Sequence, residues 1–348
     1  MKLLYNKHHD DAPADAVYIG RPGPWSNPWP IDTRARDKPA ERQRVIQLHK
    51  NWVAGQPFYR HAIATELADL PLQCYCAPLP CHGETLLEIV RENPPHPVFV
   101  FGSNTRGRHG AGAARFAVEH HGAVEGVDEG PTGNAYALPT RTFNAYGEIE
   151  SLPFKEVEEI VKQFLGFTRL RKETTFMVTR VGCGLAGFDD RDIAPLFFEA
   201  GANVLLPGRW EAMRNDRARV IIAGSRSLEK LSPSDREHVL ERIDKVLSRF
   251  DPGKLQIVSG CAAGADRIGE EWCISRGVLG NGEGLARFPA QWRVFGKRAG
   301  YLRNEVMSWY GAQLLALWDG TSPGTQSMIE LAHRDGLAVR TLRIDMDI

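Results

Sequence analysis

The sequence predicts a multidomain α/β protein, with a small N-terminal α+β domain followed by two domains in which strands and helices alternate. Its 348 residues are enough for two or three domains. Short apolar runs at residues 98–101 and 219–223 are typical of parallel strands buried on both faces. Because helices with one apolar face follow such runs, we expect the two later domains to be layered around parallel sheets.

Proline-rich and charged stretches indicate where the domains meet. Pro94, Pro95 and Pro97 form an expected linker, and the charged run at residues 209–219 marks a second boundary. The expected domains are residues 1–95, 96–212 and 213–348.

Composition narrows the class of protein. The net charge is zero, which argues against a DNA-coating role, because such proteins need a basic surplus. No apolar run reaches the roughly 18 residues of a membrane span, and the polar start of the chain is unlike a signal peptide. The six cysteines do not form a disulfide framework. We therefore expect a cytoplasmic protein with no membrane partner, and the sequence leaves a homo-oligomer open.

In the N-terminal domain, a strand at residues 17–19 leads into a loop at residues 20–30. The prolines of this loop exclude a helix or a central strand. Apolar residues at helical spacing predict helices near residues 39–53, 63–70 and 84–91.

A cysteine cluster precedes the last of these helices. Cys74, Cys76, Cys81 and His82 offer three thiolates and one imidazole, a ligand set that suits tetrahedral zinc. Side chains two apart on an extended segment point the same way, and the prolines at positions 78 and 80 allow a turn that returns the later two. Two alternatives stay open: buried free thiols that are close only in sequence, and a reactive thiol paired with His82.

The middle domain contains two glycine-rich loops. The first follows the strand at residues 98–101 and the second, at residues 181–188, follows a strand at residues 175–179. Such loops let backbone N–H groups approach a phosphate, and two of them at the ends of parallel strands can close on one ligand. Further elements are expected at residues 135–140, 154–167, 192–200 and 203–207.

The sequence from Phe101-Gly102-Ser103-Asn104 to Gly112, together with residues 181–188, resembles phage-type macro-like domains. The second loop is also similar to that of the terminal ADP-ribose glycohydrolase macrodomains. The resemblance implies a macro-like α/β/α fold and an ADP-ribose pocket with the diphosphate between the loops. Ala186 stands where those glycohydrolases carry an aspartate, so the resemblance implies binding rather than hydrolysis at this site. The implied ligand-binding residues are Gly102, Asn104, Arg108, His109, Gly110, Gly112, Gly182, Gly184, Gly187 and Phe188. Arg108 and His109 are expected to contact phosphate, or else to belong to a solvated basic loop.

The C-terminal domain begins with the strand at residues 219–223. Ser232 is the expected N-cap of a helix, with Pro233 at its first position. Further strands at residues 255–258, 285–288, 314–317 and 339–342 predict a doubly wound, Rossmann-like parallel sheet.

This domain resembles the YspA-like branch of the SLOG superfamily, related to the DNA-processing protein A fold, through residues 223–226, 259–267, 303–304 and 324–325. A nucleotide pocket at the strand ends is implied. Phosphoribohydrolases of that superfamily use an arginine, which Arg303 matches, and a glutamate, at whose position this chain has Met328. Asp266 and Glu330 are the remaining candidate catalytic carboxylates, although Asp266 can equally serve as a helix-start residue. The implied ligand-binding residues are Gly224, Ser225, Arg226, Ser259, Gly260, Gly264, Gly324 and Thr325.

The N-terminal domain resembles a small uncharacterised family through Gly20-Arg21, Asn27-Pro28 and the segment from Cys74 to Gly83. Arg21 and Asn27 are expected either to contact a phosphate or base or to brace the proline loop.

These observations predict a protein that binds a nucleotide or an ADP-ribose derivative and hydrolyses an N-glycosidic bond in its C-terminal domain. That reaction needs a carboxylate beside the developing oxocarbenium ion and cations for the phosphate. One alternative is a sensor of NAD-derived nucleotides without turnover. A DNA-associated module is the other alternative, and the neutral charge does not favour it.

Overall fold

The computed structural model describes residues 3–8 and 12–344. The chain forms two compact units, each described here by itself. Unit 1 combines Met1–Pro95 with Ala218–Ile348, and unit 2 is His96–Arg217. The mixed α/β class with parallel sheets is confirmed.

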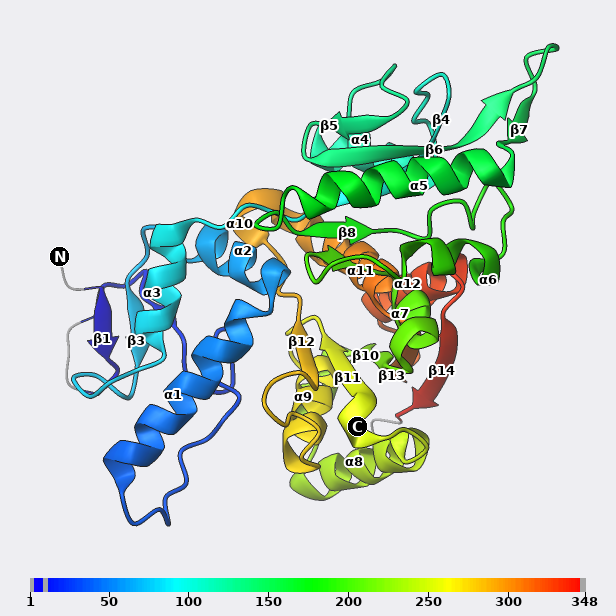
Figure 1. Cartoon of the computed structure of the whole chain (residues 1–348). Helices are drawn as coiled ribbons and strands as arrows, with labels where there is room; N and C mark the ends of the chain where they lie inside the picture. Colours follow the sequence, from blue (N-terminus) through cyan, green and yellow to red (C-terminus); the bar gives the residue numbers. More distant parts are fainter. Residues whose placement is uncertain (1–2, 9–11, 345–348) are drawn as a thin grey trace. The chain divides into compact units, whose positions relative to one another are not determined.

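The N-terminal part of unit 1 is a small three-stranded sheet with helices (Figure 1). The strand order is β1-β3-β2, and both pairings are parallel. The first helix begins where Asp37 accepts a hydrogen bond from the Ala40 N–H at 2.9 Å, with a proline in its first turn. The elements are β1 (Leu4–Asn6), β2 (Val17–Tyr18), α1 (Lys38–Ala54), α2 (Pro57–Glu66), β3 (Leu72–Cys74) and α3 (Gly83–Glu92).

The C-terminal part of unit 1 is a five-stranded parallel sheet in the order β12-β11-β10-β13-β14. The chain therefore reverses direction across the sheet between β10 and β13, which is the topological switch point of a doubly wound fold. The elements are β10 (Ala218–Gly224), η2 (Arg226–Lys230), α8 (Pro233–Leu247), η3 (Pro252–Lys254), β11 (Leu255–Ser259), α9 (Ala265–Ser275), β12 (Leu285–Arg287), α10 (Trp292–Phe295), η4 (Gly296–Arg298), α11 (Ala299–Tyr310), β13 (Gln313–Trp318), α12 (Pro323–Arg334) and β14 (Ala338–Arg343).

Alternate residues of β10 face the two helical layers. Val220 and Ile222 share a core with the apolar faces of α8 and α9. Ile221 and Ala223 share another with Met307 of α11 and with residues of α12. The predicted N-cap is confirmed, because Ser232 accepts from the Asp235 N–H at 3.2 Å. These contacts produce the predicted three-layered, doubly wound arrangement.

The N-terminal part packs directly on the edge of this sheet. Trp52 Nε1 and Gln56 Nε2 each donate to the Leu285 carbonyl of β12 at 2.9 Å. The Gln56 side-chain oxygen accepts from the Arg287 N–H at 3.4 Å. An edge strand presents unpaired backbone groups, and here α1 and the start of α2 satisfy them. Residues 1–95 thus share one hydrophobic core with residues 218–348, whereas the sequence suggested a separate domain.

A buried ion pair fastens the proline loop to the same edge. Arg287, which is 2% exposed, contacts Glu270 of α9 at 2.5 Å. Its guanidinium also donates to the carbonyls of Ser26 at 2.6 Å and Pro24 at 3.3 Å. A buried guanidinium is tolerated only when its N–H groups are paired, so this network fixes the loop.

Unit 2 is a six-stranded mixed sheet between helices. The order is β5-β6-β4-β8-β9, with β7 beside β6, and β4 runs parallel to both β6 and β8. Val100 of β4 belongs to the core under α5, while Phe99 stacks on Phe116 and His121 of α4, so the helices cover both faces (Figure 1). The elements are β4 (Val98–Asn104), α4 (Gly112–His121), β5 (Gly130–Thr132), β6 (Ala135–Phe143), β7 (Ile149–Ser151), α5 (Phe154–Arg169), β8 (Phe176–Val178), α6 (Asp190–Ile193), η1 (Ala194–Phe197), β9 (Val204–Leu205) and α7 (Gly208–Asn215).

Two predictions for unit 2 need correction. The helix expected at residues 192–200 is instead the short helix α6 followed by the 3₁₀ helix η1, which has Pro195 in its first turn. The charged run from Arg209 contains α7, whose Trp210 is fully buried with its ring 5.1 Å from that of Phe197. Unit 2 therefore extends to Arg217, beyond the expected boundary at residue 212.

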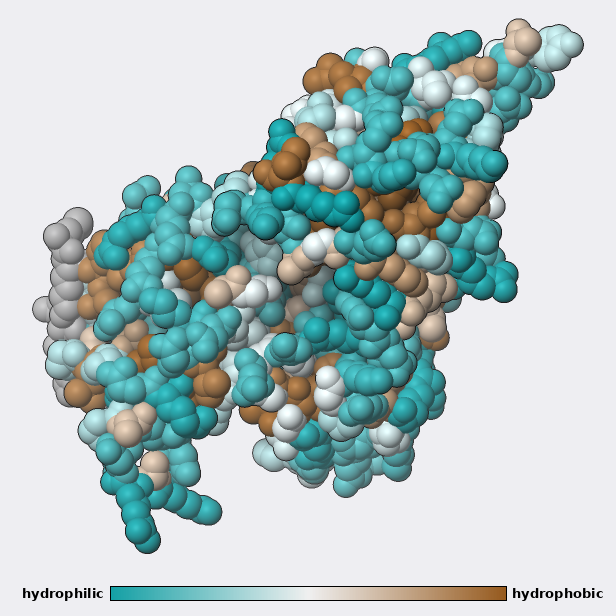
Figure 2. Space-filling model, in the orientation of Figure 1, coloured by the Kyte–Doolittle hydropathy of each residue, from teal (hydrophilic) through white to brown (hydrophobic). Residues whose placement is uncertain are grey.

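In the part of the chain that the structure describes, no helix is long and apolar enough to cross a membrane. The face shown in Figure 2 is mostly hydrophilic, with apolar side chains in small groups, as is ordinary for a protein surface.

Candidate functional site

A pocket of unit 1 lies at the carboxyl ends of β10 and β11, beside the proline loop. Its volume is about 540 Å³. Parallel α/β sheets bind ligands at this edge. The N-terminal part contributes six of the 16 lining residues, so the pocket needs both parts of unit 1. Its lining residues include Trp25, Glu66, Leu67, Arg226, Gly260, Cys261, Ala262, Ala263, Trp292, Arg293 and Arg303.

The three predicted glycines of this region serve close packing of the strand-end loops. A Cβ at Gly224 would overlap the Leu317 carbonyl, and one at Gly260 would overlap the Arg303 guanidinium. Gly264, at φ +77°, leaves no room for a Cβ beside the Ser225 carbonyl. Among these, Gly260 also lines the pocket.

The predicted hydroxyl residues are buried and paired within the protein. Ser225 Oγ accepts from the Asp319 N–H at 3.0 Å and lies 3.5 Å from Thr325 Oγ1. Ser259 Oγ donates to Glu270 at 2.7 Å. They brace the loops rather than face the pocket, while Gly324 stands open in the first turn of α12.

Three arginines of the pocket differ in how far they are already engaged. Arg226 is exposed and, among the described residues, has no hydrogen-bond or ion-pair partner. Arg303 donates from Nε to Asn304 at 2.9 Å and from Nη1 to the Gly260 carbonyl. Arg293 donates to the Ala68 carbonyl at 2.7 Å and so ties α10 to the chain after α2. Arg226 is thus the guanidinium best placed to receive an anion.

Of the two carboxylates expected near Arg303, the structure places Asp266 beside it and Glu330 away from the pocket. Asp266 lies 3.5 Å from Arg303 Nη1, but it is only 3% exposed and accepts from the Ala262 N–H at 3.2 Å. Burial raises its pKa, partly offset by Arg303. Glu330 is exposed, accepts from Gln326 at 2.9 Å and is not part of the pocket lining. Asp266 therefore braces the loop after β11, and Glu330 lies outside the site.

The sequence reasoning missed several pocket residues, among them Glu66, Trp25, Trp292 and Arg293. Glu66 lines the pocket, accepts from the Arg293 N–H at 2.9 Å, and has a pKa raised by burial. The Trp25 ring is buried, and that of Trp292 is 49% exposed. The Trp292-Arg293 pair, soon after a strand end, was the available sequence signal. No sequence signal marked Glu66 or Trp25, because only the fold brings these residues to the pocket at the ends of the strands.

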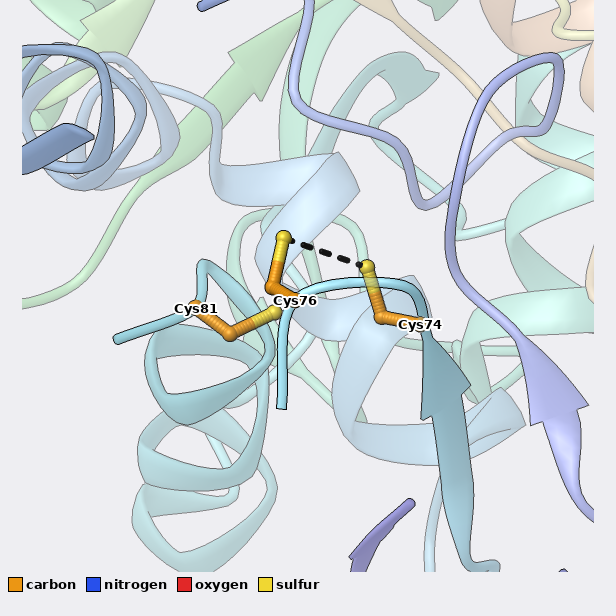
Figure 3. Close-up of side chains that lie close together, drawn as sticks. All are labelled: Cys74, Cys76 and Cys81. Atoms are coloured by element: carbon orange, nitrogen blue, oxygen red, sulfur yellow. Dashed lines mark hydrogen bonds between the residues drawn. The ribbon is translucent and has the colours of Figure 1, made fainter. Parts of the chain in front are cut away.

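The cysteine cluster is a second site in the N-terminal part. Cys74 ends β3, Cys76 lies in the following turn, and Cys81 immediately precedes α3 (Figure 3). The Cys74 and Cys76 sulfurs are 3.7 Å apart, and all three sulfurs lie within 4.8 Å of one another. The turn through the two prolines does return Cys81, as predicted.

His82 does not join the three sulfurs, which corrects the predicted four-ligand set. Its Nε2 is 3.1 Å from the Ile19 carbonyl, and its Nδ1 is 3.7 Å from Cys81 Sγ. The residues that the structure describes supply only the three cysteines to this group. His82 instead packs against the fully buried His49, with ring centroids 5.2 Å apart.

The three thiols do not ionise alike. Hydrogen bonds from Cys74 and Cys81, with a further one from Arg42, hold the pKa of Cys76 far below its usual range. Hydrogen bonds with Cys74 and Cys76, together with burial, raise the pKa of Cys81. Thiolate is the form in which cysteine binds a metal, so the lowered pKa of Cys76 suits a metal ligand.

A cavity of about 220 Å³ adjoins these sulfurs. Its lining includes Arg21, Asn27 and Arg42. Asn27 donates to the Val45 carbonyl at 2.9 Å and accepts from the Trp29 N–H, so it braces the proline loop. Arg21 donates to the Asn27 carbonyl at 3.1 Å and is otherwise exposed to this cavity.

In unit 2, the two glycine-rich loops lie side by side at the ends of β4 and β8. An added Cβ at Gly102 would lie 3.6 Å from the Gly182 N–H nitrogen. Gly110, Gly112, Gly184 and Gly187 have open space where a side chain would be. The expected juxtaposition of the loops is therefore present.

Several predicted side chains of these loops have structural roles instead. His109 is 1% exposed, and its Nε2 contacts the Val127 carbonyl at 3.1 Å, so it does not face a phosphate. Phe188 packs against the core and would lie 3.2 Å from a Cβ at Gly182. The Asn104 side chain accepts from the Arg106 and Arg108 N–H groups and shapes the first loop, while Arg108 itself is exposed.

These features define a layered α/β protein with a composite pocket and an N-terminal cysteine cluster. Residues 4–92 match a family described as a domain of unknown function (DUF4326). Over 122 residues, or 35% of its length, the chain is 35% identical to the Gene 61 protein of Mycobacterium phage D29, covering 93% of that protein. The chain therefore belongs to the same family as this phage protein. The predicted membership of the N-terminal region in an uncharacterised family is confirmed, and the other two resemblances stay predictions.

Proposed function

We propose that unit 1 binds a small phosphorylated nucleotide, such as a nucleoside monophosphate or an ADP-ribose derivative, in the pocket at the ends of β10 and β11. The pocket itself carries the proposal: three arginines and one glutamate are among the residues that line about 540 Å³, a size ordinary for small-molecule sites. Arg226 is free to pair with phosphate, and a guanidinium fork suits phosphate oxygens. The Trp292 ring offers a stacking surface to a base.

The proposal predicts that affinity depends on Arg226 and Trp292, two lining residues of the pocket. Calorimetric titration with AMP and with ADP-ribose compares the wild-type chain with Arg226→Met and Trp292→Ala. Each substitution should weaken binding about tenfold, because a hydrogen bond to a charged group contributes about 1.5–3 kcal/mol and stacking of a base on an aromatic ring about 1–3 kcal/mol. Arg249→Met is the control, because Arg249 is exposed and bonds Gln313 instead. Equal affinity in all four proteins would refute the site.

A second candidate function, hydrolysis of an N-glycosidic bond, is favoured by Glu66. This carboxyl lines the pocket, and its raised pKa suits proton donation to a leaving base. Incubation with AMP, NAD and ADP-ribose followed by chromatography with mass detection tests for free base. Turnover that Glu66→Gln abolishes, with binding retained, is the expected signature of an enzyme. If the wild-type protein binds these nucleotides without releasing a base, the result favours a sensor that binds its ligand without hydrolysing it.

We also propose that the cysteine cluster binds zinc. Tetrahedral zinc with bonds of about 2.3 Å to sulfur separates two sulfur ligands by about 3.8 Å, close to the 3.7 Å between Cys74 and Cys76. Elemental analysis of tag-free protein should find one zinc per chain. Cys76→Ser should lose it and Cys183→Ser, in unit 2, should keep it; retention of zinc by Cys76→Ser would refute the site.

A further inference from the structure

The proposed zinc would receive only three protein ligands. Cys74, Cys76 and Cys81 form one triangle of sulfurs. A fourth cysteine, histidine or acidic side chain does not join them in the described part of the chain. Structural zinc sites are almost always closed by four protein ligands, whereas sites that take an external ligand have three. The cluster thus has the composition of an open site.

The open side of the cluster faces a cavity with cationic walls. All three cysteines line the 220 Å³ cavity, together with Arg21 and Arg42. Arg42 Nη1 donates to the Pro80 carbonyl at 3.5 Å, and one nitrogen of Arg21 donates to the Asn27 carbonyl at 3.1 Å. The remaining N–H groups of both guanidiniums are available to a ligand within the cavity, because an arginine has five donors.

Charge balance indicates which ligand fits. Three thiolates around Zn²⁺ give a net charge of about −1, so nearby cations would favour an anion as the fourth ligand. Two neighbouring guanidiniums reverse this balance and supply paired donors that match phosphate oxygens. A neutral ligand would leave those cations uncompensated.

We propose that the fourth zinc position binds a phosphate group, either inorganic phosphate or the end of a phosphomonoester, held by Arg21 and Arg42. This inference rests on the proposed zinc site. It assigns to the N-terminal part of unit 1 a ligand site distinct from the nucleotide pocket. The cavity has room for a phosphate group but much less than the 540 Å³ of the nucleotide pocket.

Cobalt substitution of the full chain tests the proposal, because Co²⁺ replaces zinc and is coloured. Thiolate-to-cobalt charge-transfer absorption reports that the cysteines bind the metal, and the ligand-field bands report the fourth ligand. Titration with inorganic phosphate, and separately with AMP, should shift the ligand-field bands with saturation. AMP acting where inorganic phosphate does not would identify the phosphomonoester as the source.

Matched variants separate the possible results. Arg21→Met and Arg42→Met should keep the charge-transfer band but weaken the phosphate response about tenfold. Arg44→Met is the control, since Arg44 lies on the same helix and pairs with Glu41. The ligand-field bands could instead be unaffected by phosphate and differ between the wild type and His82→Ala. That result would show that His82 is the fourth ligand, and it would overturn the inference while leaving the zinc site intact. Absence of the charge-transfer band would overturn both.

Discussion

The buried Arg287–Glu270 pair offers the sharpest test of how unit 1 is joined. Glu270→Gln removes the negative charge but keeps the shape and the acceptor for Ser259. Arg287, at 2% exposure, would then be a buried cation without a counter-ion. Breaking such a pair typically lowers the free energy of unfolding by about 3–5 kcal/mol. Arg287 also anchors the Pro24 and Ser26 carbonyls, so the loop that walls the nucleotide pocket should loosen.

Urea unfolding followed by tryptophan fluorescence measures this loss. Of the eight tryptophans, only Trp210 belongs to unit 2, so the signal reports chiefly on unit 1. With an m value of about 3 kcal/mol/M, the midpoint should fall by about 1–2 M. Glu88→Gln is the control, because its partner Lys50 is exposed and the pair should contribute little.

The double variant distinguishes a coupled pair from two independent contacts. Adding Arg287→Met to Glu270→Gln removes the unpaired charge at the cost of two backbone acceptors, about 1–3 kcal/mol each. The double variant should therefore lose less stability than the sum of the two single losses, and AMP affinity should fall in both. A double variant whose loss equals the sum of the two single losses would refute the coupling.

Three further predictions concern single positions. Gly264→Ala should lower the free energy of unfolding by well over the roughly 1 kcal/mol that we expect for Gly277→Ala. Both glycines have a positive φ, but only at Gly264 would a Cβ overlap a neighbour, the Ser225 carbonyl. Equal losses of the two variants in urea unfolding would contradict this prediction. Burial, aided by nearby histidines, lowers the pKa of His121 to about 3. The unfolded chain therefore binds the proton more readily than the folded chain. The contribution of His121 to the free energy of unfolding is complete above about pH 6.5 and is about 2 kcal/mol smaller at pH 5. In His121→Phe the free energy of unfolding should fall less between pH 6.5 and pH 5 than in the wild type. An unchanged fall would exclude His121 as its cause. Gly184→Glu should abolish ADP-ribose binding by unit 2, if those loops bind it, without unfolding the chain.

The sequence predicted the C-terminal parallel sheet well because its buried strands leave a clear pattern, whereas the short strands β1, β3, β5 and β7 were not predicted. The run at residues 219–223 and the Ser232 cap both appear as expected. Short elements were less predictable. The helix expected at residues 192–200 is broken at Pro195, and α7 was hidden in a charged run because only Trp210 marks its buried side.

The candidate site was harder to predict because it depends on packing between distant segments. Arg226, Gly260 and Arg303 were predicted from the resemblance of the C-terminal domain to a nucleotide-binding superfamily, and they do line one pocket. Glu66 reaches it only because α2 packs beside α10, which no local pattern reveals. Conversely, glycines and serines that suggest a phosphate loop also allow two loops to pack tightly, and here Gly264 and Ser225 do that.

Photo-crosslinking with an azido-adenine analogue of AMP tests the central claim most directly, since mass spectrometry of the digested protein shows where the base lies. The account predicts labelling of peptides that contain Trp25 or Trp292, with unlabelled AMP competing and Arg226→Met reducing the yield. Labelling of residues 102–112 or 181–188 instead, or none that AMP competes away, would contradict a nucleotide site in unit 1.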